Sequence, residues 1–294
     1  MQNKLYEKQY LEGELEVEFI PQGTLAEKLR AGGNGIPAFY TITGIGTFLE
    51  EGGFPILNPQ NGEEPTLVTK ARDVKIFNGQ KYLLEEALTS DYSIVKGWKA
   101  DEKGNVVFRK SALNFNIDVA KAGKVCIVEV EEIVPTGSID PNHVHLPHIF
   151  VQRLVKGDHY ERRIEILPKD GTSTSAEAEK KDKKHSFSEK DRKRRRIAMR
   201  AARDVKDGMY INLGTGIPTI APSFIDPDTD VTFQSENGIL GLGNFASIDE
   251  ADADLINAGK QAVGVVKGAS FFSSSDSFGM IRGKYIDVSA MSNP

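Results

Sequence analysis

The sequence has little of several features that mark large classes of protein. It holds one cysteine, Cys126, so no disulfide can form within the chain, and a reducing compartment is expected. Its apolar runs are too short to span a bilayer, so no membrane partner is expected. Basic residues are not in excess, because 37 Lys and Arg against 42 Asp and Glu give a net charge of −5. Nucleic acid is therefore not expected as the main partner.

The amino-terminal segment has no arginine before Arg30. Five glutamates precede that residue: Glu7, Glu12, Glu14, Glu16 and Glu18. A mitochondrial presequence is normally rich in arginine and poor in acids, and a secretory signal needs an apolar stretch that is absent here. From these residues alone, the expected location is the cytosol.

What is present is typical of a globular protein with one large or two ordinary domains. The 294 residues are 39% hydrophobic and the mean hydropathy is −0.35. Cys126 lies in the apolar run 124–130, which has the pattern of a strand. We therefore interpret Cys126 as an unreactive core residue.

Hydrophobic periodicity in the first half predicts strands mixed with helices. Residues 14–19 alternate glutamate with apolar residues, which is the period of a half-buried strand. Thr24 followed by Glu27 forms a capping-box pattern, and the predicted helix ends at Gly32-Gly33. Further strands are predicted at residues 92–95, 106–109 and 124–130. The pattern favours the α/β fold class.

The composition changes sharply at Pro168. Residues 169–190 are Lys, Glu, Ser, Thr and Asp with almost no apolar side chain, so they cannot bury enough surface to offset their ordering entropy. We predict a first domain at 1–167, a flexible charged linker at 168–190 and a second domain at 191–294.

A basic run, Arg192-Lys-Arg-Arg-Arg196, follows the linker. It resembles a nuclear signal or a phosphate-binding patch. The favoured alternative is the start of a surface helix, because the next residues supply an apolar face: Ile197, Ala198, Met199, Ala201, Ala202 and Val205.

In the second half, strands are predicted at 209–213, 231–234, 263–266 and 285–288. Pro218 suits the first turn of a helix, and another helix is predicted at 275–282, ended by Gly283. The chain stops six residues after the last predicted strand. A parallel sheet does not normally end on a strand with nothing to cover it, so truncation is expected.

Glu236 is the strongest candidate for chemistry. It lies in a Gly-containing turn at the carboxyl end of the predicted strand 231–234, the edge where open α/β sheets bind ligands. A carboxylate is ionised at neutral pH and can act as a nucleophile without a general base. The alternative is that Glu236 caps the turn or pairs with a surface lysine.

Two other patterns are weaker. Gly238, Gly241 and Gly243 lack the spacing of a dinucleotide-binding loop. His143, His145 and His148 are close enough to raise the possibility of zinc, but no fourth ligand is evident and no metal is expected.

The segment Phe233-Gln-Ser-Glu-Asn-Gly-Ile-Leu-Gly241 resembles the active-site signature of the family I CoA-transferases. Similar likeness to the succinyl-CoA:3-ketoacid enzymes of that family runs over nearly the whole chain outside the linker. It is carried by Glu14-Leu-Glu-Val-Glu18, Pro21-Gln-Gly-Thr-Leu-Ala-Glu27, Gly35-Ile-Pro-Ala-Phe-Tyr-Thr41, Phe108-Arg-Lys-Ser-Ala112, Gly208-Met-Tyr210, Glu250-Ala-Asp-Ala-Asp-Leu-Ile-Asn-Ala-Gly259 and Gly268-Ala-Ser-Phe-Phe272.

The resemblance implies two open α/β domains of the CoA-transferase type, both incomplete here. It implies that Glu236 is the nucleophile, that Asn212 and Lys260 bind CoA, and that Gln22 lies at the acyl site. It further implies succinyl-CoA and acetoacetate as substrates, a homodimer, no cofactor apart from the CoA thioester itself, and the mitochondrial matrix as location.

The sequence also departs from the family. The Gly-Gly-Phe motif of the first domain is absent upstream of Gln22, and Gly52-Gly-Phe54 lies in the wrong context to replace it. The glycine-rich segment after the last strand is absent as well, and the six residues from Ser289 to Pro294 resemble nothing in the family. Two functional classes therefore stay open: a CoA-transferase acting through Glu236, and a non-catalytic fragment or isoform.

Overall fold

We describe the protein from a computed structural model, which covers residues 3–59, 64–158, 163–164, 166 and 188–291. The chain divides into two compact units, Met1–Asp91 with Lys121–Lys124, and Tyr92–Ala120 with Val125–Pro294. The domain boundaries predicted above follow composition and stay a prediction. Most of the predicted linker lies outside the described residues, and Glu189 at its end already begins a helix.

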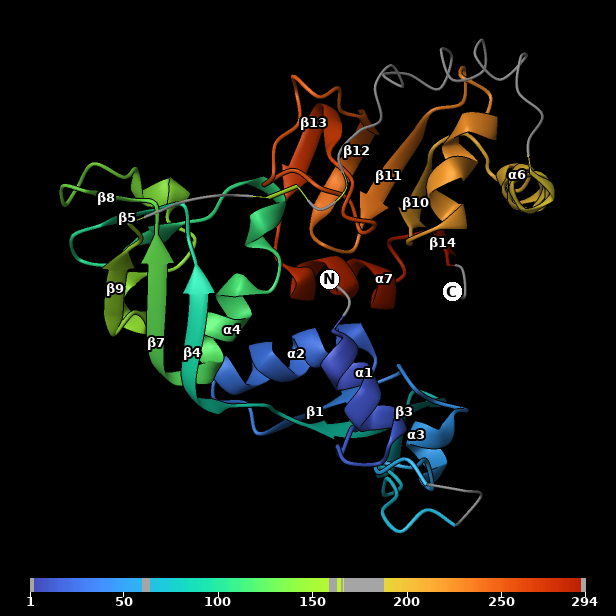
Figure 1. The fold of residues 1–294 in the computed structure, drawn as a ribbon, viewed down its shortest axis with the longest axis horizontal. Helices are drawn as coiled ribbons and strands as arrows, with labels where there is room; N and C mark the ends of the chain where they lie inside the picture. Colours follow the sequence, from blue (N-terminus) through green and yellow to red (C-terminus); the bar gives the residue numbers. More distant parts are fainter. Residues whose placement is uncertain (1–2, 60–63, 159–162, 165, 167–187, 292–294) are drawn as a thin grey trace. The chain divides into compact units, whose positions relative to one another are not determined.

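The first unit is a small antiparallel sheet with helices (Figure 1). Its sheet has the order β1-β3-β2. The buried carboxylate of Glu85 on β3 accepts a hydrogen bond from Lys28 on α2 at 2.9 Å, with Arg72 at 3.6 Å. The elements are α1 (Lys4–Leu11), α2 (Gln22–Gly33), β1 (Ala38–Thr41), α3 (Phe48–Glu51), β2 (Val74–Phe77) and β3 (Gln80–Glu86).

Two predictions in this unit are wrong. Residues 14–19 form no strand, although Leu15 and Val17 are more buried than the glutamates beside them. The N–H of Val17 donates to the Ile56 carbonyl at 2.8 Å, but residues 14–19 form no ladder with a second strand among the described residues. The capping box also fails, because α2 starts at Gln22 after Pro21 and leaves Thr24 inside the first turn.

The described residues of the second unit form three sheets. Two are small and have the orders β4-β7-β9 and β6-β5-β8. Their elements are β4 (Ser90–Lys96), β5 (Lys99–Asp101), β6 (Val106–Val107), η1 (Lys110–Leu113), α4 (Asn116–Ala122), β7 (Gly123–Val130), β8 (Glu132–Val134), η2 (Pro141–His143), η3 (His148–Phe150) and β9 (Arg153–Lys156).

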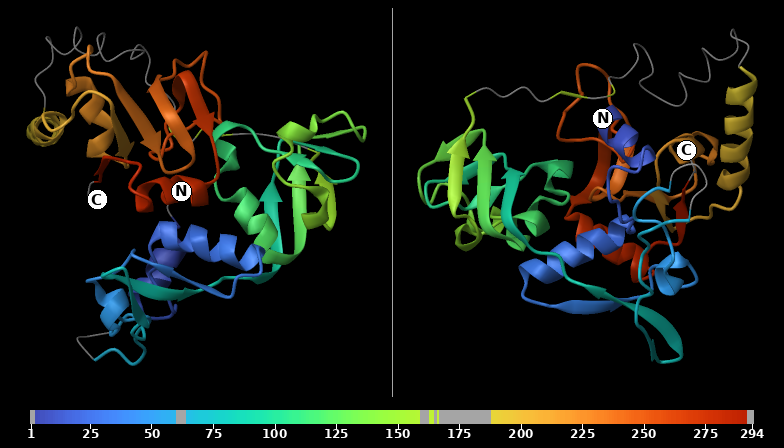
Figure 2. Two further views of the ribbon diagram at one scale, coloured as in Figure 1. Left: turned by 180° about the vertical axis from the view of Figure 1, so that it is seen from behind. Right: turned by 60° about the horizontal axis from the view of Figure 1, so that its bottom comes forward.

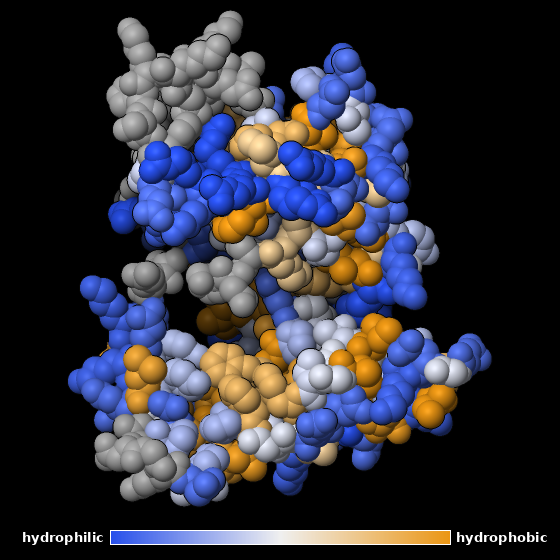
Figure 3. Space-filling view, turned by 90° about the vertical axis from the view of Figure 1, so that its right-hand side faces the viewer, coloured by the Kyte–Doolittle hydropathy of each residue, from blue (hydrophilic) through white to orange (hydrophobic). Residues whose placement is uncertain are grey.

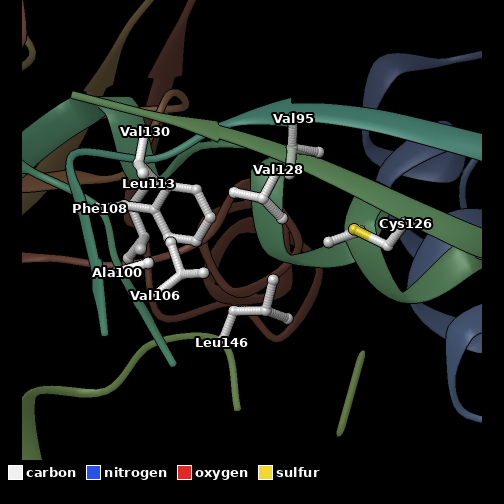
Figure 4. Packing of buried hydrophobic residues seen from close by; sticks show 10 residues of the cluster. Val95, Ala100, Val106, Phe108, Leu113, Cys126, Val128, Val130 and Leu146 are labelled. Atoms are coloured by element: carbon white, nitrogen blue, oxygen red, sulfur yellow. The ribbon is translucent and has the colours of Figure 1, made fainter. Parts of the chain in front are cut away.

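A compact apolar cluster combines residues of both sheets with residues of η1 and α4 (Figure 4). Phe108 and Leu146 pack with valines of β4, β6 and β7. Cys126 is fully buried in this cluster, and burial raises the pKa of its thiol, with the Ser93 hydroxyl acting in the opposite direction. The prediction that Cys126 is a core residue is confirmed.

The largest sheet has the strand order β13-β12-β11-β10-β14. Strands β14, β10 and β11 are parallel, whereas β12 and β13 are antiparallel to their neighbours (Figures 1 and 2). The elements are α6 (Glu189–Ala202), β10 (Met209–Leu213), η4 (Ile217–Phe224), β11 (Val231–Ser235), β12 (Ile239–Phe245), β13 (Val263–Phe271), α7 (Ser274–Arg282) and β14 (Val288–Ala290).

Most predicted elements of this half are present. The strand at 209–213 is β10, the strand at 231–234 is β11, and the helix at 275–282 is α7. Pro218 lies at the start of η4, which is a 3-10 helix. The last strand is displaced, because residues 288–290 rather than 285–288 find a partner in β10.

The basic run lies on α6, as predicted for a surface helix. Ala198 and Ala202 are buried, and the Arg195 guanidinium lies 5.1 Å from the Phe224 ring of η4. Ile197 and Met199 are exposed, so the apolar face is narrower than predicted. The space-filling view toward α6 shows strongly hydrophilic residues with apolar ones among them (Figure 3).

Candidate functional site

The sharp turn between β11 and β12 carries Glu236. Strand β11 ends at Ser235, so Glu236 lies at the carboxyl end of a parallel strand, as predicted. The N–H of Gly238 donates to the Ser235 carbonyl at 3.0 Å and closes the turn. Gly238 has φ of 101°, and a Cβ there would lie far inside van der Waals contact of the Phe272 carbonyl oxygen. Only glycine fits this position.

The carboxyl group of Glu236 is largely removed from water. Its Oε2 atom is buried and has no hydrogen-bond partner. Burial raises the pKa of Glu236, while the backbone N–H groups of Glu236 and Asn237 and the Ser235 hydroxyl act in the opposite direction. A poorly solvated, more basic carboxylate is a better nucleophile than one on the surface.

Glu236 opens into a pocket of about 240 Å³. Three segments line it: residues 111–114 around η1, the pair Glu236 and Asn237, and residues 253–260 in the loop before β13. Lys260 is the one cation among the lining residues. The arrangement places an acidic residue, Glu236, and a basic one, Lys260, on the walls of one cavity, which suits an anionic ligand with an electrophilic centre.

Hydrogen bonds and ion pairs hold two of these walls together. Arg109 donates to Asp254 and to Asp252, each at 2.9 Å, and Lys110 donates to Asp252 at 2.7 Å. Burial would raise the pKa of Asp252, but Lys110 and Arg109 outweigh it and lower that pKa overall. The Ser111 hydroxyl adds a 2.6 Å hydrogen bond to the Asp254 carbonyl. The segment before α4 is thereby fixed to the loop that carries Lys260.

Lys260 sits in a tight hairpin in a left-handed backbone conformation. Its φ is 64°, and its N–H donates to the Asn257 carbonyl at 2.9 Å. The Asn257 side chain also accepts from the N–H of Gln261 at 3.0 Å. This conformation is costly for a residue with a Cβ, so the turn presents the lysine to the pocket at some expense of stability.

We expect Lys260→Gly to be more stable than Lys260→Ala by about 1 kcal/mol, because glycine adopts positive φ without strain. Both variants remove the ammonium group, so the difference isolates the backbone. Urea unfolding of the two variants measures it. Equal stabilities would show that the hairpin relaxes out of the left-handed conformation.

The raised pKa of Glu236 predicts a pH-dependent stability difference between the wild type and Glu236→Gln. Below the unfolded-state pKa, about 4.3, Glu236 is protonated in both the folded and the unfolded state, so its ionisation does not affect the free energy of unfolding. As the pH rises through the higher folded-state pKa, the folded state holds its proton longer, and its stability falls relative to that of the glutamine variant.

We therefore expect Glu236→Gln to gain stability over the wild type as the pH rises from about 4.3, the unfolded-state value, to the raised folded-state pKa, and to keep that gain above it. Urea unfolding of both proteins at intervals across that range measures the difference. Parallel stability curves would contradict a buried, destabilised carboxylate.

The structure brings together two of the four predicted site residues, Glu236 and Lys260. Asn212 lies on β10, is buried, and does not line the pocket; its side chain bonds to Gln234 and Ser289. Gln22 is exposed at the first residue of α2, in the other unit. The roles of all four stay predictions.

Sequence reasoning missed the wall formed by residues 111–114. Ser111 and Asn114 lie more than 120 positions before Glu236. Ser111 belongs to the motif Phe108-Arg-Lys-Ser-Ala112, but neither residue type indicates chemistry by itself. Asn237, which donates to the Ile256 carbonyl at 2.6 Å, stood beside Glu236 in the motif and could have been named.

No metal-ligating cluster of His, Cys, Asp or Glu occurs among the described residues. His145 accepts the Phe108 N–H through Nδ1 at 3.0 Å, and His148 Nδ1 lies 3.1 Å from the Asn105 side-chain oxygen. In the described part of the chain, no helix has the length and apolar character needed to cross a membrane.

Comparison with known proteins agrees with the resemblance found in the sequence. The family described as Coenzyme A transferase matches residues 1–157 and 194–291. The chain is 53% identical to the human protein "Succinyl-CoA:3-ketoacid coenzyme A transferase 2, mitochondrial" over 290 residues, which is 99% of this chain and 54% of the relative. It is 51% identical over 290 residues to the Rattus norvegicus protein "Succinyl-CoA:3-ketoacid coenzyme A transferase 2A, mitochondrial", again covering 99% of this chain and 54% of the relative.

Among solved structures, an acyl-CoA transferase from E. coli O157:H7, crystallised as a thioester complex with CoA, has a similar fold. It aligns with a TM-score of 0.67 at 20% identity and covers 97% of this chain and 51% of that one. The expected α/β fold of the CoA-transferase type is confirmed, and the chain spans about half the length of the mammalian relatives it matches. Because the family matches most of its length, the chain belongs to the Coenzyme A transferase family.

Proposed function

We propose that this protein transfers CoA from succinyl-CoA to a 3-oxoacid such as acetoacetate, with Glu236 as the nucleophile. The observation that carries the proposal is the Glu236 carboxyl group, which has one buried, unpartnered oxygen and lines a pocket shared with Lys260. The names of the mammalian relatives support the choice of substrates. They also support a mitochondrial location; the matrix and a homodimer are part of the same proposal.

The reaction starts with attack of a Glu236 carboxylate oxygen on the thioester carbonyl carbon. The C–S bond breaks, CoA leaves as its thiolate, and a mixed anhydride joins the succinyl group to Glu236. The thiolate then attacks the glutamyl carbonyl carbon and succinate departs, so that Glu236 is held as a thioester of CoA.

The second half runs the same steps backward with the new acid. The acetoacetate carboxylate attacks the glutamyl thioester and forms a second mixed anhydride with release of the thiolate. Attack of the thiolate on the acetoacetyl carbonyl gives acetoacetyl-CoA and restores the Glu236 carboxylate. No other cofactor enters, because the CoA thioester is itself the substrate.

The pocket residues supply binding and orientation. Lys260 offers positive charge to the anionic CoA, and Asn212 and Gln22 are proposed to contact CoA and the acyl group respectively. A carboxylate is a weak nucleophile, so binding energy from the remote parts of CoA has to contribute to the rate.

The test is the intact mass of the chain after incubation with acetoacetyl-CoA, followed by peptide mapping. A covalent CoA adduct on the peptide that contains Glu236 supports the enzyme. A folded chain that forms no adduct would contradict the proposal and favour the non-catalytic alternative.

A further inference from the structure

A row of polar side chains crosses the largest sheet just below the Glu236 turn. Ser289 on β14, Asn212 on β10 and Gln234 on β11 are neighbours in register on three parallel strands. Gln234 is 0% exposed and Asn212 2%. Apolar side chains normally occupy such positions, and buried amides are costly unless all their polar groups are paired.

Hydrogen bonds link this row into a chain with one direction. The Ser289 hydroxyl donates to Asn212 Oδ1 at 2.9 Å, and Asn212 Nδ2 donates to Gln234 Oε1. Gln234 Nε2 donates to the Ser277 hydroxyl oxygen on α7. The Ser277 hydroxyl in turn donates to the Ser235 carbonyl at 3.3 Å. The network therefore ends on the peptide group that joins Ser235 to Glu236.

Ser235 accepts two further hydrogen bonds. Its carbonyl also accepts the Gly238 N–H at 3.0 Å, and its hydroxyl accepts the Ala258 N–H at 3.1 Å. Ser235 and Ser277 are both 0% exposed. The orientation of the 235–236 peptide is thus fixed from the strand, from α7 and from the loop that carries Lys260.

The orientation of the Glu236 carboxyl group depends on the peptide that these hydrogen bonds hold. Its Oε2 atom has no hydrogen-bond partner, so contacts of that oxygen do not fix where it points. The groups that do act on the carboxyl group, the N–H groups of Glu236 and Asn237 and the Ser235 hydroxyl, all belong to the turn itself, so its orientation depends on how residues 235–237 are held.

We propose that Gln234 and Ser277 are positioning residues, which set the direction of the Glu236 carboxylate by holding the Ser235–Glu236 peptide. The effect of this positioning on catalysis rests on the proposed function, whereas the orientation of the Glu236 carboxylate does not. Neither residue touches the pocket, so each acts only through the backbone.

The decisive comparison is Ser277→Ala against Ser93→Ala. Ser93 is also buried, and its hydroxyl donates to the Ala120 carbonyl at 3.2 Å, away from the pocket. Both variants therefore lose one buried hydroxyl-to-carbonyl hydrogen bond. Ser277→Ala also removes the hydroxyl oxygen that accepts from Gln234 Nε2, so a larger loss of stability is expected from it than from Ser93→Ala. Only Ser277→Ala releases the peptide before Glu236.

Two readouts are needed. The first is the rate of CoA adduct formation on Glu236 from acetoacetyl-CoA. This rate should fall about tenfold or more in Ser277→Ala, because a positioning contact is lost. In Ser93→Ala, where no such contact is lost, the rate should stay within about twofold of wild type. The second is the ¹³C resonance of the Glu236 carboxyl group, identified by its loss in Glu236→Gln. Its chemical shift and titration midpoint should change in Ser277→Ala and not in Ser93→Ala.

The second readout needs no turnover and separates the two proposals. A wild type without adduct would contradict the proposed function, while the carboxyl resonance would still test the positioning role. A Glu236 resonance unchanged in Ser277→Ala, or changed equally in Ser93→Ala, would overturn that role. If Ser277→Ala does not fold, Gln234→Met removes the same support from the other side of the Ser277 hydroxyl, and the same readouts apply.

Discussion

Replacing Glu236 with glutamine is expected to lower the rate of CoA transfer, or of CoA adduct formation, by at least about 10³-fold, the scale of loss seen when a covalent nucleophile is removed. Glutamine keeps the size of the side chain but has no anionic oxygen, so the anhydride cannot form. The measurement is the initial rate of acetoacetyl-CoA formation from succinyl-CoA and acetoacetate, with the intact mass of the chain recorded in parallel.

The matched control is Glu132→Gln, which makes the same chemical change on β8. Glu132 pairs with Lys99 at 2.9 Å and is half exposed, outside the pocket. Exposed ion pairs contribute little to stability, so this variant should behave like wild type. Retention of more than about a tenth of the rate in Glu236→Gln would rule out covalent catalysis by Glu236, given the usual size of the loss.

The second large effect is expected from Gly238→Ala. The new methyl group would meet the Phe272 carbonyl oxygen, and the residue would be forced to keep φ near 101°. Backbone strain and overpacking each cost a few kcal/mol, so we expect the free energy of unfolding to fall by about 3 kcal/mol or more. Urea unfolding followed by circular dichroism measures it.

Gly268→Ala separates the two causes. Gly268 has a similar φ of 86°, but a Cβ there would meet nothing within 4 Å. Only the backbone strain applies, and a loss of about 1 kcal/mol is expected. If both variants lose the same stability, the contact with Phe272 is not the reason that glycine is needed at position 238.

Much of the second half of the fold could be predicted from the sequence, because its signals are local. The predicted strands at 209–213 and 231–234 are β10 and β11, and the segment 275–282, predicted to end at Gly283, lies in α7. The position of Glu236 at the carboxyl end of a strand followed from the same reasoning. Each of these depends on residues within a few positions of one another.

The errors occur where a local pattern needed a distant partner. Residues 14–19 have the alternation of a strand but no ladder beside them, and residues 285–288 were displaced by the register that β10 imposes. No strand was predicted at residues 239–245, where two glycines weaken the local strand signal, and pairing with β11 and β13 makes this segment β12.

The α/β class, the core position of Cys126 and the candidate residues Glu236 and Lys260 could be inferred from sequence patterns and family-like motifs. The grouping of the other pocket residues depends on tertiary contacts. Ser111 and Asn114 reach it because Arg109 and Lys110 bond to Asp252 and Asp254, more than 140 positions away. The buried network from Ser289 to Ser277 was likewise invisible, because each single serine or amide in it has an ordinary local role, and only strand register and the packing of α7 align them beneath Glu236.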